Sequence, residues 1–245
     1  MKMTNIRAFN YDNALRGMRN PKESWDKSDT YYGFEYYDKN NIYLRTNFQD
    51  FKILYEDNDI VEFLSVGPKD LELIQKLVKG GPEHRKFLRQ IFVTADITAP
   101  LYVFKEFDTY KVATTANSTS TMHKLTSKPI TLDCFEIDDY QEMIENPYEI
   151  NPYFQVDKIY QEVDEHIDWL ENLRQKAIAY KGNPNPYWKE LVRWLPEGWL
   201  QTRTWTANFE VIYNMEHQRS HHKLTEWQPI LKALTGLPYY QEFTH

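Results

Sequence analysis

The sequence has little cysteine and no long apolar run, and both shortages restrict what the chain can be. Cys134 is the single cysteine, so an internal disulfide is excluded. No apolar run follows Met1 and Lys2 to act as a signal peptide, and no stretch approaches the roughly twenty apolar residues that a membrane helix needs. We therefore expect an intracellular, cytoplasmic protein without a membrane partner.

Positive charge is also in short supply. The formal net charge is -7 at pH 7, which argues against broad attraction to nucleic acid but leaves room for a small basic pocket that holds a phosphate. Bulky side chains are abundant instead, because 41% of the residues are hydrophobic and 16% are aromatic. We expect a globular protein that binds no nucleic acid and holds any anionic ligand locally.

Hydrophobic patterns predict the elements of the first half of the chain. Residues 31–48 and 51–65 each place aromatic or apolar runs around a turn-prone centre (DKNN and EDND), which predicts two hairpins. Apolar residues at helical spacing after Pro68 predict a helix over 67–81. The segment 91–111 predicts a buried strand followed by a helix that Pro100 opens.

The second half is predicted to be mainly helical. Helices are expected over 157–180, 185–196, 205–219 and 223–234, and a strand over 129–137. The predicted fold class is therefore α+β, a small antiparallel sheet flanked by long helices. Residues 1–29 lack clear periodicity and are interpreted as an N-terminal arm, and residues 30–245 as a single α+β domain.

The stretch MEHQRSHHKLTEW, residues 215–227, is rich in histidine. His217 and His221 are four residues apart, so a helix could present both to one metal ion, with His222 or Glu226 as a third ligand. A zinc helix usually brings a further ligand and a hydrogen-bonded second shell, which the sequence does not show. We favour surface histidines at a helix end, where a cation meets the negative pole of the macrodipole, and predict no metal site.

Two further candidates lie in the middle of the chain. A charged stripe on a short helix (Lys105, Glu106, Asp108, Lys111) precedes a hydroxyl-rich loop, TTANSTST, which suits a phosphate or a sugar but also resembles a plain loop. Cys134 could be a catalytic nucleophile, but the alternation in TLDCFEI favours a small buried strand residue.

One C-terminal stretch, LPEGWLQTRTWTANFEVIYNMEHQR, resembles the flavin-dependent thymidylate synthases. In that family a Leu-Pro pair precedes a Trp-Thr-x-Asn segment, and an arginine follows eleven residues after the asparagine. Eleven residues are close to three helical turns, so on one helix Asn208 and Arg219 would share a face about 16 Å apart. The residues that keep the family spacing are Leu195, Pro196, Trp205, Thr206, Asn208 and Arg219.

Two weaker matches lie upstream. The segment ITAPLYVFKEFDTYKVATTANSTS is similar to the family's strand, helix and loop with an Arg-His-Arg motif. The segment PEH, residues 82–84, resembles the family's Pro-Phe-Glu-His. In the first segment Lys105 and Glu106 stand at the family's Arg-Gln, Thr109, Tyr110 and Lys111 at its Arg-His-Arg, and Asn117 and Ser120 at its asparagine and phosphate-binding serine.

The resemblance implies a homotetramer with shared active sites that methylates dUMP reductively. Methylenetetrahydrofolate would supply the carbon, and NADPH would supply hydride through FAD. Arg219 would be the catalytic residue, which holds and polarises the pyrimidine. The implied substrate contacts are Lys105, Glu106, Ser118, Ser120 and Arg219, and the implied FAD contacts are His84, Thr109, Lys111, Asn117 and Asn208.

The chain departs from the family at the Arg-His-Arg motif. Thr109 and Tyr110 offer neutral donors where charge-assisted hydrogen bonds contribute roughly 1.5–3 kcal/mol each. Two alternatives therefore stay open: the same fold with a different pyrimidine-nucleotide modification, and a non-catalytic nucleotide-binding or structural homologue.

Overall fold

The structure is a computed structural model that describes residues 1–36, 52–57, 60–137 and 156–245. Its internal contacts group the chain into two compact units. The expectation of one domain over 30–245 stays a prediction. Unit 1 contains Met1–Lys2, Ile97–Thr109 and Asn117–Arg203, and unit 2 contains Met3–Asp96, Tyr110–Ala116 and Thr204–His245.

The first residues of the chain belong to the fold. Strand β1 (Lys2–Phe9) joins the four-stranded sheet, and helix α1 (Tyr11–Arg19) buries one face. Interpretation of residues 1–29 as an arm outside the core is therefore wrong for these elements. Helix α1 buries four residues at helical spacing, namely Tyr11, Ala14, Leu15 and Met18. The polar residues between them obscure this spacing in the sequence.

Unit 2 contains a three-stranded antiparallel sheet. Its order is β2 (Tyr31–Tyr36), β4 (Ile60–Ser65), β3 (Lys52–Asp57). The second predicted hairpin is confirmed as β3 and β4, whereas the turn of the first, residues 38–41, lies outside the described residues. Helix α2 (Pro68–Lys79) follows, and Pro68 opens it as predicted because the first helical position needs no N–H donor.

The four-stranded sheet has the order β1, β5, β7, β6. Strand β5 (Phe92–Pro100) confirms the predicted strand, but it alternates between buried and partly exposed residues instead of being buried throughout. The long helix expected through 205–219 needs correction, because residues up to Asn208 form β7 (Leu200–Asn208). Alternating threonines in TRTWTAN favour a strand, and α8 (Phe209–Arg219) begins only after it. Strand β6 (Thr115–Ser118) completes this sheet.

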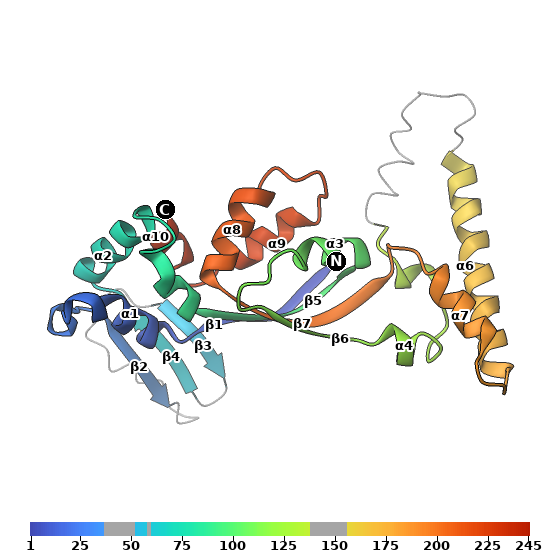
Figure 1. Ribbon diagram of the computed structural model, residues 1–245, viewed down its shortest axis with the longest axis horizontal. Helices are drawn as coiled ribbons and strands as arrows, with labels where there is room; N and C mark the ends of the chain where they lie inside the picture. Colours follow the sequence, from blue (N-terminus) through green and yellow to red (C-terminus); the bar gives the residue numbers. More distant parts are fainter. Residues whose placement is uncertain (37–51, 58–59, 138–155) are drawn as a thin grey trace. The chain divides into compact units, whose positions relative to one another are not determined.

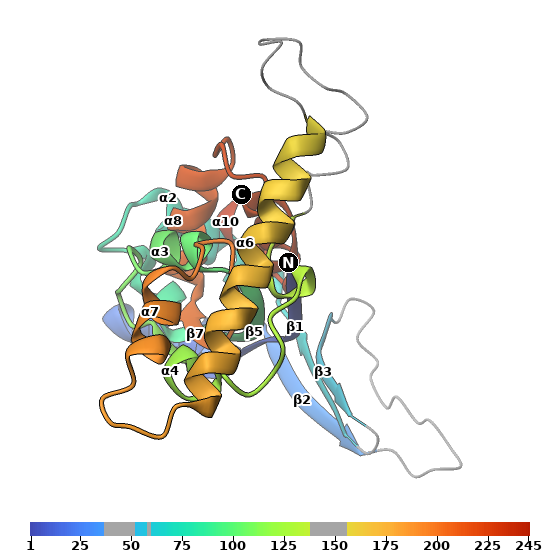
Figure 2. The ribbon, with the colours of Figure 1, turned by 90° about the vertical axis from the view of Figure 1, so that its right-hand side faces the viewer.

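Unit 1 is mainly helical. Helix α3 (Leu101–Phe107) follows β5 as predicted but ends before Asp108 and Lys111, which the sequence placed on it, and α4 (Thr121–Lys124) follows β6. Helices α6 (Val156–Ala179) and α7 (Pro186–Arg193) are confirmed and lie side by side in both views (Figures 1 and 2). Their apolar faces enclose the core of this unit, which contains Leu125, Ile130, Ile167, Leu170, Leu173 and Leu191.

The strand predicted over 129–137 is wrong. Residues Leu132–Cys134 form a 3-10 turn, and Phe135 makes only an isolated bridge to Trp199. Cys134 is therefore half-buried in a turn instead of buried in a strand. Apolar alternation over so short a run does not distinguish a strand from a turn that packs on a core.

The C-terminal residues complete the core of unit 2. Helix α9 (Trp227–Thr235) packs beside α8 (Figure 1), and α10 (Tyr240–Thr244) ends the chain. The rings of Tyr11, Phe209 and Tyr240 meet edge to face with centroids 5.3 to 5.7 Å apart. Mixed helices and an antiparallel sheet confirm the predicted α+β class. In the described part of the chain, every helix is too short or too polar to cross a membrane.

Candidate functional site

Helix α8 holds Asn208 and Arg219 at its two ends. Asn208 is the N-cap residue, and its Oδ1 accepts a hydrogen bond from the backbone N–H of Val211 at 3.1 Å. Its Nδ2 donates to the carbonyl oxygen of Val112 at 3.3 Å, and the residue is 0% exposed. The amide predicted to contact a cofactor is thus engaged in starting the helix.

Arg219, the last residue of α8, is held by two aromatic side chains. Its Nε donates to the Tyr110 hydroxyl at 3.0 Å, and that hydroxyl donates to Oε1 of Gln218 at 3.0 Å. The guanidinium lies 5.7 Å from the ring centroid of Tyr110 and 5.3 Å from that of Trp227. We call Arg219, Tyr110, Gln218 and Trp227 the arginine cluster; it restricts the plane of a donor fork suited to a carbonyl or phosphate edge.

The arginine cluster brings together the two sequence stretches that resemble the family. Tyr110 reaches the C-terminal end of α8, and Val112 binds the N-cap of the same helix. Lys111 lies between them and is exposed. Predicted residues Lys111, Asn208 and Arg219 therefore gather around one helix of unit 2.

Unit 2 also contains a large open groove, which we call the cationic groove. It lies between the end of α1, helix α2 and the 3-10 helix η3 (Arg85–Gln90), and its volume is about 1600 Å³. His84, a predicted FAD contact, is one of its lining residues. Leu73 and Leu77 of α2 add half-buried apolar surface.

Unpaired positive charge distinguishes the cationic groove. Within the described ranges, its six open cations have no carboxylate within the 4.0 Å that defines a salt bridge. Two carboxylates, Glu72 and Glu83, share the lining. Such a cluster on a protein of formal charge -7 creates a local positive potential that favours anionic ligands. The six cations are Lys22, Lys27, Lys69, Lys76, Lys86 and Arg89.

Arg19 also lines the groove, but Asp70 neutralises it. Its guanidinium lies 2.6 Å from Oδ1 of Asp70, and the two side chains are 6% and 0% exposed. Burial by itself would raise the pKa of Asp70, but hydrogen bonds from Ser28, Thr30 and Arg19 outweigh it and lower the pKa. This pair therefore fixes the groove wall instead of binding a ligand.

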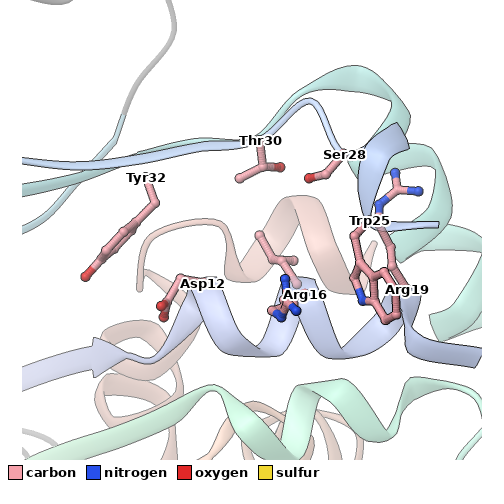
Figure 3. A pocket seen from close by; sticks show the side chains of 8 residues that line it. Asp12, Arg16, Arg19, Trp25, Ser28, Thr30 and Tyr32 are labelled. Carbon is pink, nitrogen blue, oxygen red and sulfur yellow. The ribbon is translucent and has the colours of Figure 1, made fainter. Parts of the chain in front are cut away.

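A smaller cavity of about 190 Å³ lies beside the same arginine. Figure 3 shows Arg19 and Trp25 at one end of it and Asp12 and Tyr32 at the other, with Arg16 between them. The Arg16 guanidinium lies 5.4 Å from the centroid of the Trp25 ring. All these residues belong to the segment around the predicted arm, so sequence reasoning missed this cavity.

Arg85 joins the groove wall to helix α8. Its Nε donates to Oε1 of Glu210 at 3.1 Å, and its guanidinium lies 4.3 Å from the ring centroid of Tyr213. Arg85 directly follows His84, and Glu210 lies in the first turn of α8. The groove and the helix that ends in Arg219 are therefore parts of one packed framework.

The other predicted contacts lie in unit 1, where several are already engaged. Lys105 forms an ion pair with Glu197 at 2.6 Å, and the Thr109 hydroxyl donates to the carbonyl oxygen of Glu106 at 2.7 Å. Ser120 caps α4 by accepting from the N–H of His123 at 3.2 Å. Asn117 and Ser118 are exposed on β6. These residues belong to unit 1, whereas Lys111, Asn208 and Arg219 belong to unit 2.

The histidine-rich stretch ends α8 and shows ordinary local contacts. The His217 ring lies 4.1 Å from that of Tyr213, centroid to centroid, and the His222 ring accepts from the N–H of Leu224 at 3.2 Å. Among residues whose placement is described, three or more potential ligands nowhere gather into a possible metal site. The assignment of His217, His221 and His222 to a helix end agrees with the bounds of α8.

Comparison with known proteins bears on the fold. No protein-family model matches the sequence, and no curated protein matches it. Two crystal structures of the flavin-dependent thymidylate synthase ThyX from Helicobacter pylori, both with FAD and dUMP, match it with a TM-score of 0.58. Identity is 18% and 17%, and each match covers 100% of this chain and 97% of the other. The resemblance is thus confirmed for the fold: this chain has the fold of flavin-dependent thymidylate synthase.

Proposed function

We propose that this chain is a divergent flavin-dependent thymidylate synthase-like enzyme. In this proposal FAD binds in the cationic groove, dUMP binds at Arg219, and dUMP is methylated with methylenetetrahydrofolate and NADPH as co-substrates. The observation that carries the proposal is the set of six groove cations that form no ion pair with a described residue, in a groove that His84 also lines, on a protein that has the corresponding fold and a net negative charge.

The groove residues fit a flavin dinucleotide. The volume of the groove, about 1600 Å³, exceeds the roughly 300–1,000 Å³ of ordinary small-molecule pockets, so the groove suits a long ligand. Lys86 and Arg89 would hold the diphosphate, while Leu73 and Leu77 would contact the ring system. When bound, FAD would supply the hydride chemistry, and the protein would supply placement and electrostatics.

Arg219 would bind and orient the pyrimidine. Its planar fork matches a carbonyl edge, and the contacts with Tyr110 and Trp227 restrict its conformations before the nucleotide arrives. Pre-ordering of a long side chain lowers the entropy lost on binding, because rotamer-rich side chains cost about 0.5–1.5 kcal/mol each to immobilise.

Melting temperatures with FAD and dUMP added separately test both assignments. A ligand at about one hundred times its Kd stabilises the native state by about 2.7 kcal/mol, so binding is measurable. We expect K86E/R89E to lose the FAD shift and keep the dUMP shift, and Arg219→Ala to do the reverse. Lys232→Glu, an exposed lysine on α9 outside the groove, is the matched control.

The assignment of FAD to the groove fails if K86E/R89E and Lys232→Glu show the same FAD shift. Formation of dTMP from labelled dUMP with both co-substrates tests turnover. Light scattering of the same protein tests the homotetramer that the resemblance implies.

A second candidate function is a non-catalytic nucleotide-binding homologue. It is favoured by the position of the family's Arg-His-Arg motif, where the Thr109 hydroxyl turns back to Glu106 and Tyr110 is 9% exposed and engaged with Gln218 and Arg219. This candidate is favoured over the enzyme if the purified protein is colourless and forms no dTMP. It should then be stabilised by dUMP but not by FAD.

A further inference from the structure

Helices α6 and α7 expose four large aromatic side chains. Trp169, Tyr180, Tyr187 and Trp194 are 40%, 41%, 39% and 55% exposed. The rings pair across the two helices: Trp169 and Trp194 have centroids 6.3 Å apart, and Tyr180 and Tyr187 5.7 Å apart. Exposed rings that pair in this way mark an interaction site more often than scattered single residues do.

The four rings lie along one face. Tyr180 follows Trp169 by about three helical turns, and Trp194 follows Tyr187 by about two turns. The Trp194 indole is fixed, because its Nε1 donates to Oε1 of Glu190 at 2.8 Å. We call this surface the α6–α7 face. Its aromatic groups are presented in defined orientations, at an angle of 72° between the two indoles.

The tryptophan end of the α6–α7 face is acidic. Glu162, Glu165 and Asp168 are exposed at intervals of three residues along α6, directly before Trp169. Among the side chains that the structure describes, Glu165 and Asp168 have no cation within 4.0 Å. Lys176 follows two turns after Trp169, so the tyrosine end is less acidic.

The charge decides between occupants of the face. A second copy docked by a two-fold axis that passes through the tryptophan end would bring the same carboxylates together, which is unfavourable. A basic segment would satisfy them, and arginine fits best because its guanidinium stacks on indole and forms paired hydrogen bonds with a carboxylate. Glu165, one turn before Trp169, is placed for that pairing.

We propose that the α6–α7 face docks a basic segment of a partner protein, which places an arginine side chain against Trp169 and Trp194 and beside Glu165. This interaction is separate from the proposed nucleotide chemistry. It would tether the protein to a cationic partner through unit 1.

Binding of a fluorescently labelled hexa-arginine peptide to the full chain tests the proposal. Anisotropy at about 50 and about 150 mM salt separates general attraction from the specific contact, because exposed charges are screened more strongly at the higher salt. We expect Trp169→Leu and Trp194→Leu each to weaken binding about three- to thirtyfold, the range of an exposed to a desolvated cation–π contact.

Trp25→Leu is the matched control, since Trp25 is 41% exposed in unit 2, and it should leave the affinity unchanged. Circular dichroism and melting temperature verify that each variant folds, and E162Q/E165Q should weaken binding in a folded protein even if a tryptophan variant fails to fold. Equal effects of Trp169→Leu and Trp25→Leu would overturn the proposal, as would equal affinity for hexalysine or no binding at the lower salt. Self-association that Trp169→Leu abolishes would also overturn it, because a second copy would then occupy the face.

Discussion

The cationic groove of unit 2 and the α6–α7 face of unit 1 carry clusters of exposed charge of opposite sign. Six cations line the groove, whereas three carboxylates of α6 precede Trp169 on the α6–α7 face. Each unit also contains a neutralised pair, Arg19 with Asp70 and Arg174 with Glu171. The ion pairs stabilise the packing within each unit, whereas the clusters of like charge are the sites proposed for ligands. The net charge of -7 conceals both kinds of cluster.

Removal of the buried carboxylate Asp70 should change the free energy of unfolding most strongly. Asp70→Asn leaves the Arg19 guanidinium, 6% exposed, without its counter-charge, and loss of one partner of a buried pair costs about 3–5 kcal/mol. Urea unfolding should show that loss. Asp12→Asn removes an exposed carboxylate from α1, the helix that carries Arg19. This variant should change the free energy of unfolding by less than about 0.5 kcal/mol. Similar losses in both variants would refute the structural role of the pair.

The next largest effect is expected in the arginine cluster. Tyr110→Phe removes the acceptor of Arg219 Nε and the donor to Gln218, so unfolding free energy should fall by about 1–3 kcal/mol. The dUMP-induced shift should shrink as well, because Arg219 loses its orientation. Tyr213→Phe keeps the ring that stacks with Arg85 and serves as the control; an unchanged Tyr110→Phe would show that the cluster contributes nothing.

A smaller, pH-dependent effect is expected on α6. Hydrogen bonds from Arg174 are the main cause that lowers the pKa of Glu171 from 4.5 to about 2. A depressed carboxyl pKa stabilises the fold above its unfolded value and loses that effect as pH falls through the folded value. Glu171→Gln should therefore reduce stability by about 0.5–1 kcal/mol near neutral pH and by almost nothing below about pH 2. Urea unfolding across this range would contradict the assignment if the difference were independent of pH.

Neutralisation of the open cations should have the smallest effect on stability. K76Q/K86Q removes two cations of the groove lining that form no ion pair with a described residue, so unfolding free energy should change by no more than about 0.5 kcal/mol. The salt dependence of the FAD shift should become weaker, since fewer charges act on the diphosphate. A destabilisation as large as that of Asp70→Asn would contradict the claim that these two lysines contribute little to stability.

Helices with strong local signals could be predicted from the sequence. Helix α2 has Pro68 at its start and buried Ile74 and Val78 one turn apart, and these signals act within the helix itself. The same kind of signal was present in α1, where Tyr11, Ala14 and Met18 keep helical spacing, but the surrounding polar residues obscured it.

Strand β7 and the groove could not be read in the same way. A strand that leads directly into a helix changes its period at Asn208, and neither period extends over enough residues to be recognised alone. The groove gathers cations from three segments, with Lys22, Lys76 and Arg89 far apart in the chain. Only tertiary packing makes these cations neighbours, so no local sequence pattern predicts their cluster.

The contact between Arg85 and Glu210 has a thermodynamic consequence. Because it joins the groove wall to the helix that carries Arg219, we expect the proposed ligand of one side to order part of the other. Linkage then requires reciprocity: the factor by which a flavin changes the affinity for nucleotide equals the factor by which nucleotide changes the affinity for flavin. Arg85→Lys would bring both factors towards one together, without altering either binding surface directly.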